Sequence, residues 1–228
     1  MSEAWMTSAD VVDRRPIVIV PVGSWEQHGA HLPFDTDTVI AVDLVRRVVE
    51  RLTDIPLLPT DPIAFGNSGE HGDFPGTISI GRETTTKVLV EIARSCDWAD
   101  GVVFVNGHGG NAPAIHDAME LILFEGRRAM AWSPTTMDSH DTHAGHTETS
   151  VMLALDPSRV LMDRAEKGVT APLDQLLDVM RENGVRAVSP NGVLGDPRGA
   201  DAAHGLALLD DWEESLASSI HRWHRVRP

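Results

Sequence analysis

The sequence of 228 residues is poor in cysteine and contains no long apolar run. Cys96 has no partner, so an intramolecular disulfide and a thiolate zinc site are both excluded. It lies at the expected end of a helix, and we interpret it as a packed or surface thiol. No stretch approaches the roughly 20 apolar residues of a membrane-spanning helix, and residues 1–15 lack the apolar core of a signal peptide. These absences predict a cytoplasmic protein without a membrane partner.

Positive charge is also scarce. Lysine and arginine number 19 against 34 aspartates and glutamates, which gives a formal net charge of −15. Proteins that bind phosphate backbones usually carry a basic face, and the sequence shows none, so we expect no nucleic-acid partner. Where acidic residues are metal ligands, bound cations offset part of this negative charge.

Short apolar, β-branched runs alternate with amphipathic stretches along the whole chain. The longer stretches have the periodicity of helices; residues 38–52, for example, place Val42, Val45 and Val49 on one stripe. The alternation predicts an α/β fold with a mostly parallel sheet and helices on both of its faces, in a single domain over residues 1–228. Ligands of such folds bind beyond the carboxyl ends of the strands. Strands are expected at residues 17–22, 55–60, 77–80, 101–105 and 128–132.

The first polar cluster follows the strand that ends at residue 22. Glu26 and His28 are two positions apart, so their side chains point the same way in an extended segment. Asp37 precedes a helix and can bring its carboxylate back toward them. Such a set of ligands suits Zn, Mn or Fe(II). The alternative is that Asp35 or Asp37 only caps the helix, and for His31 we favour a plain loop histidine over a ligand.

The second cluster is Asn-Gly-His-Gly-Gly-Asn at residues 106–111, between a buried strand and a helix. Its glycines let the backbone bend tightly and approach a ligand closely, and His108 would project at the carboxyl edge of the sheet. A glycine-rich turn at a helix N-terminus can instead bind phosphate, although this sequence is neither a dinucleotide fingerprint nor a P-loop.

The third cluster, residues 138–150, holds three histidines and Glu148. We expect Glu148 to complete a metal shell and His143 to act as a general acid or base, because imidazole titrates near neutrality. The alternative is that Glu148 is only a first-turn helix residue favoured by the helix dipole, with the histidines in a flexible loop. His140 and His146 stay unassigned.

Residues 66–76 form a fourth polar stretch, which four glycines and Pro75 mark as a loop. Glu70 and His71 in this loop are either contacts in the wall of a substrate pocket or parts of a purely structural turn. The sequence does not distinguish these two interpretations.

Taken together, these clusters resemble the creatininase family of metal-dependent amidohydrolases. The resemblance implies a three-layer α/β/α sandwich, a centre of two divalent ions (Zn, Fe(II) or Mn) and a homo-oligomer of six or more subunits. The matching motifs are Gly23-Ser-Trp-Glu-Gln-His-Gly29 with His31-Leu-Pro33 and Asp37, then Asn106-Gly-His-Gly-Gly-Asn111, then His143-Ala-Gly-His-Thr-Glu-Thr-Ser150.

The resemblance also implies roles for individual residues. It places Glu26 and His108 on one ion and His28 on the other, with Asp37 bridging the two. Creatininase itself has a further glutamate ligand inside the second motif, where this chain has Gly110. The last ligand is therefore expected to come from elsewhere, and Glu148 is the natural donor. The same departure argues against creatinine as the substrate.

Within the family, residues 143–153 and 192–197 look closest to the peptidases of the mycofactocin system. For that branch the resemblance implies a modified precursor peptide as substrate. The enzyme would release its C-terminal valine and tyrosine as a crosslinked dipeptide, on the way to a redox cofactor.

The expected chemistry is amide hydrolysis, in which the ions activate a water molecule for attack on the carbonyl carbon. His143 would then pass a proton to the leaving nitrogen. Three alternatives remain at this point. The same centre would serve a small cyclic amide or a formamide, which predicts a closed pocket rather than an open groove. A non-catalytic metal-binding protein predicts bound metal without turnover, and a phosphate-binding module predicts no metal ligands at Glu26 and His28.

Overall fold

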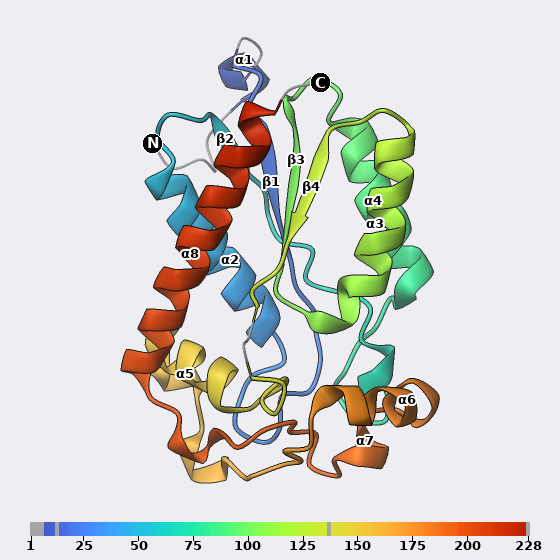
Figure 1. The fold of residues 1–228 in the computed structure, drawn as a ribbon, viewed down its shortest axis with the longest axis vertical. Helices are drawn as coiled ribbons and strands as arrows, with labels where there is room; N and C mark the ends of the chain where they lie inside the picture. The colour runs from blue at the N-terminus through green and yellow to red at the C-terminus, as the bar shows by residue number, and fades with distance from the viewer. Residues whose placement is uncertain (1–6, 12–13, 136–137, 227–228) are drawn as a thin grey trace.

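A four-stranded sheet forms the centre of the computed structural model, which describes residues 7–11, 14–135 and 138–226 (Figure 1). Part of segment 1–15, on which the sequence-based expectation about a signal peptide rests, lies outside the described residues. All neighbouring strands are parallel, in the order β2-β1-β3-β4. Every residue of β1 and β3 is buried, which explains why both strands are unbroken apolar runs in the sequence. The strands are β1 (Ile17–Val22), β2 (Leu57–Pro59), β3 (Gly101–Asn106) and β4 (Ala129–Trp132).

Helices cover both faces of this sheet, so the predicted three-layer α/β/α sandwich is confirmed (Figure 1). On one face, Leu44 and Leu216 pack with Ile19 in the larger apolar core. On the other face, Leu89 and Phe104 belong to a second core. The first face is covered by α2 (Thr36–Arg51) and α8 (Ala202–Arg225), against which α5 (His146–Leu155) packs, and the second by α3 (Gly81–Ser95) and α4 (Ala112–Phe124). None of the described helices is long and apolar enough to cross a membrane.

Short elements fill the rest of the described chain. Two of the helices, α6 and α7, lie with α5 beyond the end of the sheet where the strands finish (Figure 1). The short helices are α1 (Ser8–Val11), α6 (Leu173–Asn183) and α7 (Val185–Val188), and the 3₁₀ turns are η2 (Gly69–His71), η3 (Gly109–Asn111), η4 (Pro157–Arg159), η5 (Met162–Arg164) and η6 (Pro197–Gly199).

The strand predicted at residues 77–80 is wrong. This segment forms no ladder with any described strand and makes isolated backbone hydrogen bonds instead. The Ile78 N–H donates to the carbonyl of Trp25, and the Ile80 N–H donates to the carbonyl of Gly66. The segment is therefore joined by its backbone to neighbouring loops rather than to a strand of the sheet.

Two glycines allow the ends of β1 and β3 to meet the first turn of α2. A Cβ atom at Gly23 would lie 2.1 Å from Thr38 Oγ1, and one at Gly107 would lie 2.3 Å from the carbonyl oxygen of Asp37. Any larger residue at either position would force the helix away from the strand ends. The side chain of Asp37 is thereby held at the carboxyl edge of the sheet, between the loops that follow β1 and β3.

Candidate metal centre

Carboxylates and imidazoles from five segments converge at the carboxyl edge of the sheet. Most are almost completely buried; Glu148 keeps a fifth of its side chain exposed. Their ligand atoms form three groups in which all atoms lie within 4.8 Å of one another, a spacing that a metal ion can span. The three groups among the described residues are Glu26, His71 and His143; His28, His143 and Glu148; and Glu26, His28 and Asp37.

Asp37 lies between two imidazoles, one on each carboxylate oxygen. Its Oδ1 is 3.1 Å from His28 Nε2, and its Oδ2 is 3.2 Å from His108 Nδ1. The Ser24 hydroxyl donates to Oδ2 at 2.6 Å. Burial alone would raise the pKa of Asp37, but His28 and His108 hold it well below its usual range. A carboxylate that stays ionised and has a ring on each side could bind more than one cation.

Backbone carbonyls fix which nitrogen of each ring can face Asp37. His28 Nδ1 lies 3.1 Å from the carbonyl oxygen of Glu26, and His108 Nε2 lies 3.0 Å from that of Asn67. A carbonyl oxygen only accepts, so these two nitrogens carry hydrogen. In the neutral rings the lone pairs then belong to His28 Nε2 and His108 Nδ1, which both point at Asp37. Histidine ligands of metals are usually held in this way.

The buried carboxylates create a demand for positive charge. Burial opposes protonation of the imidazoles, yet Asp37 raises the pKa of His28 to about 10, and Glu26 raises that of His108 to about 10. Burial likewise raises the pKa of Glu26 to about 8. In the absence of a cation the cluster is therefore neutralised by protons. Divalent ions would supply the same charge and displace those protons.

Glu26 provides the clearest test of whether these residues suit a metal. Both of its carboxylate oxygens are buried, and neither has a hydrogen-bond partner of good geometry among the described residues. Oε2 lies 3.0 Å from His108 Nε2, and Oε1 lies 3.4 Å from His71 Nε2 and 3.6 Å from His143 Nδ1. A buried carboxylate without donors is costly unless a cation compensates it. The donor set of carboxylates and imidazoles therefore fits Zn, Mn or Fe(II).

His143 joins this cluster as a neutral ring. Its Nε2 lies 2.9 Å from the carbonyl oxygen of Gln27 and carries the hydrogen, so its Nδ1 lone pair faces Glu26. Burial lowers the pKa of His143 well below its usual value, and His28 and His71 lower it further. A neutral imidazole with a free lone pair can accept a proton from a reacting group.

Glu148 lies in the first turn of α5 and also beside the cluster. The Ala144 N–H donates to its Oε2 at 2.6 Å, and the same oxygen is 3.8 Å from His28 Nε2. Ala144 has a φ of 51°, a left-handed conformation that residues other than glycine rarely adopt. Burial raises the pKa of Glu148 to about 7. The residue therefore combines both positions considered from the sequence, a helix start and a site next to His28.

His108 belongs to none of the three groups, although it contacts Glu26 and Asp37 individually. The remaining histidines of the motifs are also outside the groups, and they contact none of the three carboxylates in them. His31 is buried, and its Nε2 lies 2.9 Å from Thr149 Oγ1. His140 is exposed, with Nδ1 2.8 Å from the carbonyl oxygen of Thr170. His146 Nε2 is 3.0 Å from the carbonyl oxygen of Gly199.

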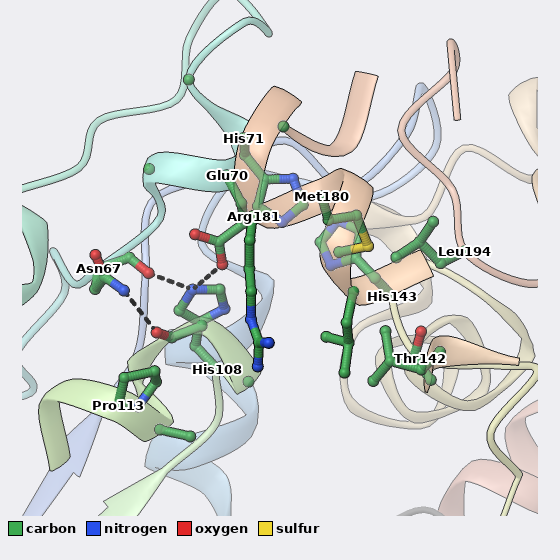
Figure 2. Close-up of a pocket in the computed structure, with 18 of the residues that line it drawn as sticks. Asn67, Glu70, His71, His108, Pro113, Thr142, His143, Met180, Arg181 and Leu194 are labelled. Atoms are coloured by element: carbon green, nitrogen blue, oxygen red, sulfur yellow. Dashed lines mark hydrogen bonds and ion pairs between the residues drawn. The ribbon is translucent and has the colours of Figure 1, made fainter. Parts of the chain in front are cut away.

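Sequence reasoning missed or left open three contributors to the site. His71 lies within the cluster. Its Nδ1 is 2.9 Å from Nε2 of Gln27, a residue 44 positions earlier in the chain. Glu70 Oε1 lies 3.7 Å from His108 Nε2 (Figure 2). A Cβ atom at Gly110 would lie only 2.0 Å from that same oxygen, so the Glu70 carboxylate fills the space above Gly110. The only signal in the sequence was a polar pair between glycines.

A pocket of about 900 Å³ opens beside the cluster (Figure 2). His71, His108 and His143 face it from the sheet side, and α6 contributes Met180 and Arg181 from the other side. Arg181 is the only lysine or arginine among the described residues that line this pocket. The volume of the pocket lies toward the upper end of the range for small-molecule sites, so the pocket can take a substrate larger than a single small amide.

The turn at residues 106–111 is organised for folding rather than for phosphate. The Asn111 side-chain amide donates to the carbonyl of Gly23 at 3.0 Å, and that of Asn106 donates to the carbonyl of His108 at 2.8 Å. Glu26 and Glu70 lie next to this turn and would repel an anion. The arrangement therefore disfavours a phosphate-binding module.

Comparison with known proteins agrees with this geometry. The family model described as "Creatininase: Creatinine amidohydrolase" matches residues 2–220. A mycofactocin precursor peptide peptidase of Mycolicibacterium smegmatis is 48% identical over 97% of this chain and 91% of its own. The solved structures of a creatininase with Mn and of a Zn–Zn creatininase variant have TM-scores of 0.79 and 0.77, each with 23% identity over 96% of both chains. The chain belongs to the creatininase family.

Proposed function

We propose that this protein is a metal-dependent peptidase of mycofactocin biosynthesis. It would release the C-terminal dipeptide derived from valine and tyrosine from the modified precursor peptide. The observation that carries the proposal is the 48% identity, over nearly the whole chain, to a mycofactocin precursor peptide peptidase. The buried cluster around Asp37 supports the proposal, because its carboxylates and imidazoles could hold the metal that this kind of amide hydrolysis needs. Residues 1–228 would form one catalytic domain that works in the cytoplasm.

Two divalent ions, Zn, Fe(II) or Mn, would be held by five side chains at this centre. Asp37 would be shared, since its two oxygens face different imidazoles. When bound, the ions supply the positive charge that activates water and stabilises negative charge on the carbonyl oxygen. The proposed ligands are Glu26, His28, Asp37, His108 and Glu148.

The chain itself contributes proton transfer and positioning. His143 is the group that would accept a proton at Nδ1 and deliver it to the leaving nitrogen, while the Gln27 carbonyl holds its Nε2–H. Because that hydrogen bond persists in either protonation state, the ring keeps its orientation during transfer. Glu148 faces the same pocket, with its Oε2 held by the Ala144 N–H. We assign Glu148 both to the metal shell and to catalysis.

Two alternatives explain the geometry less completely. Hydrolysis of a small cyclic amide or a formamide would use the same centre, but it leaves most of the 900 Å³ pocket without a role. A non-catalytic metal-binding protein would not need a neutral His143 ring, with its lone pair on Nδ1, in the wall of the pocket.

We further propose that the protein is a homo-oligomer of six or more subunits. Phe34 and Phe65 are exposed, and both rings lie against Trp25. The Phe34 ring is stacked on Trp25 with ring centroids 5.9 Å apart, and the Phe65 ring is tilted with centroids 6.1 Å apart. Ile78, half exposed, is joined to Trp25 through its backbone N–H. A contiguous apolar patch of this kind on a protein surface marks an interaction site.

Release of the dipeptide is expected to require metal. The purified protein is incubated with the modified precursor peptide, with and without chelator, and products are followed by mass spectrometry. Chelator should abolish release of the C-terminal dipeptide, and added Zn, Fe(II) or Mn should restore it. A protein shown to hold two ions that releases nothing would refute the peptidase proposal and favour the small-amide hydrolase.

Replacement of the shared ligand should remove both ions. Loss of a residue that only hydrogen-bonds to a metal ligand typically lowers metal affinity by roughly 10–100-fold. For Asp37→Ala, which removes a ligand itself, a larger fall in metal affinity is expected. Metal content after dialysis is measured by elemental analysis. Asp35→Ala is the matched control, because Asp35 lies two residues earlier and pairs with Arg159 instead. Full metal content in Asp37→Ala would show that the assignment is wrong.

Loss of the proposed proton carrier should slow turnover without loss of metal. For His143→Gln, kcat for peptide release is expected to fall by about 10²–10⁴-fold, because the proton at the leaving nitrogen has no carrier. The ion content should equal that of the wild type. His140→Gln provides the control, since His140 is exposed and outside the three groups. Wild-type kcat in His143→Gln would exclude this role.

The oligomer is tested by its mass in solution. Analytical ultracentrifugation of the wild type should give at least six times the 24.8 kDa of the chain. Phe65→Glu places a charge in the aromatic patch and should shift the protein toward smaller species. A monomeric wild type at micromolar concentration would contradict the proposal.

A further inference from the structure

The side-chain amide of Gln27 is held in one orientation by two glycines. The Gly29 N–H donates to Gln27 Oε1 at 2.9 Å, and Gln27 Nε2 donates to the carbonyl of Gly192 at 3.0 Å. Gly29 and Gly192 have φ values of 65° and 78°, and a Cβ atom at Gly192 would lie 2.0 Å from Gln27 Oε1. One neighbour only donates and the other only accepts, so the oxygen and nitrogen of the amide cannot exchange places.

This fixed amide determines the protonation of His71. Gln27 Nε2 lies 2.9 Å from His71 Nδ1, and an amide NH₂ group can only donate. Gln27 Nε2 also lies 3.0 Å from His143 Nε2, but the amide has only two hydrogens and one of them donates to the Gly192 carbonyl. Because His143 Nε2 donates its own hydrogen to the Gln27 carbonyl, the second amide hydrogen goes to His71 Nδ1. The His71 ring then carries its hydrogen on Nε2. That Nε2 lies 3.4 Å from Glu26 Oε1, so the protonated nitrogen of the ring lies at the edge of the cluster.

In His143 the backbone of Gln27 leaves the nitrogen without hydrogen, rather than the one with hydrogen, on the side of Glu26. The Gln27 carbonyl accepts the Nε2–H of His143 at 2.9 Å, which leaves the Nδ1 lone pair pointing at Glu26 Oε1 from 3.6 Å. The two rings are neighbours, with centroids 4.4 Å apart. Gln27, His71 and His143 are all buried, and both rings line the pocket.

We propose that Gln27 is a positioning residue that makes His71 a hydrogen-bond donor and His143 an acceptor at the edge of the pocket, next to Glu26 Oε1. The inference rests on the proposed hydrolysis of an amide at this centre. Such a reaction needs both functions: a lone pair takes a proton from the attacking water, and an N–H stabilises negative charge on oxygen. The protein would supply both from two neutral rings, without any change of rotamer.

The assignment gives His71 a role other than that of a metal ligand, although it belongs to one of the three groups. As a donor it cannot bind a metal through Nε2, because that nitrogen carries the hydrogen. In the resting protein its Nε2 lies 3.4 Å from Glu26 Oε1, although neither Glu26 oxygen has a hydrogen-bond partner of good geometry among the described residues. His71 would thus orient a proposed ligand and remain available to a carbonyl oxygen in the pocket.

The positions of the hydrogens test this inference directly. Neutron diffraction from crystals of the metal-loaded protein, exchanged into heavy water, should show deuterium on Nε2 of both His71 and His143. Nδ1 of each ring should carry none. Deuterium on His71 Nδ1, or a His71 Nε2 without deuterium, would overturn the proposal. This measurement needs no substrate, so its result is independent of whether the protein cleaves the precursor peptide.

A kinetic comparison provides the second arm. For Gln27→Met, which keeps the length of the side chain but not its amide, kcat is expected to fall about 10–100-fold, the usual cost of losing an outer partner of a site. KM and bound metal should stay within about twofold of the wild type, since the amide binds neither ion nor substrate. Gln175→Met is the matched control, because Gln175 is exposed on α6. Equal kcat for Gln27→Met and wild type, or loss of its metal, would contradict a positioning role.

Discussion

Carboxylates held away from water at one end of a parallel sheet are the feature on which the rest of this structure depends. Glu26 and Asp37 are almost fully buried, and burial of such groups is unfavourable without compensating positive charge. Imidazoles and, in the proposed active form, divalent ions provide that charge. The surrounding structure can be understood as the framework that keeps these groups close together despite the cost.

The sheet provides this framework because its strands are parallel. Loops that follow β1 and β3 leave from the same edge, and Gly23 and Gly107 allow α2 to begin between them. Backbone carbonyls of the loops then orient the rings of His28 and His108. Positions on rigid strand ends and a helix start are more precise than positions in a free loop, which suits chemistry sensitive to small displacements.

Much of this arrangement was predictable from local patterns. Unbroken apolar runs identified β1 and β3, because strands buried on both faces have no polar alternation. Motifs directly after those runs identified Glu26, His28 and His108, since parallel strands share one carboxyl edge. The prediction at residues 77–80 failed because the backbone of this segment hydrogen-bonds to loops rather than to neighbouring strands. The hydrogen-bond network of Gln27 was also beyond reach, since it joins segments 44, 116 and 165 residues away.

The central claim is that Asp37 holds two ions together, and anomalous diffraction from crystals soaked in Zn or Mn tests it most directly. The account predicts two peaks, roughly 3.5–4 Å apart, one on each side of the Asp37 carboxylate, with His28 on one ion and His108 on the other. A single ion that does not contact Asp37, or no ion within the cluster, would contradict the account.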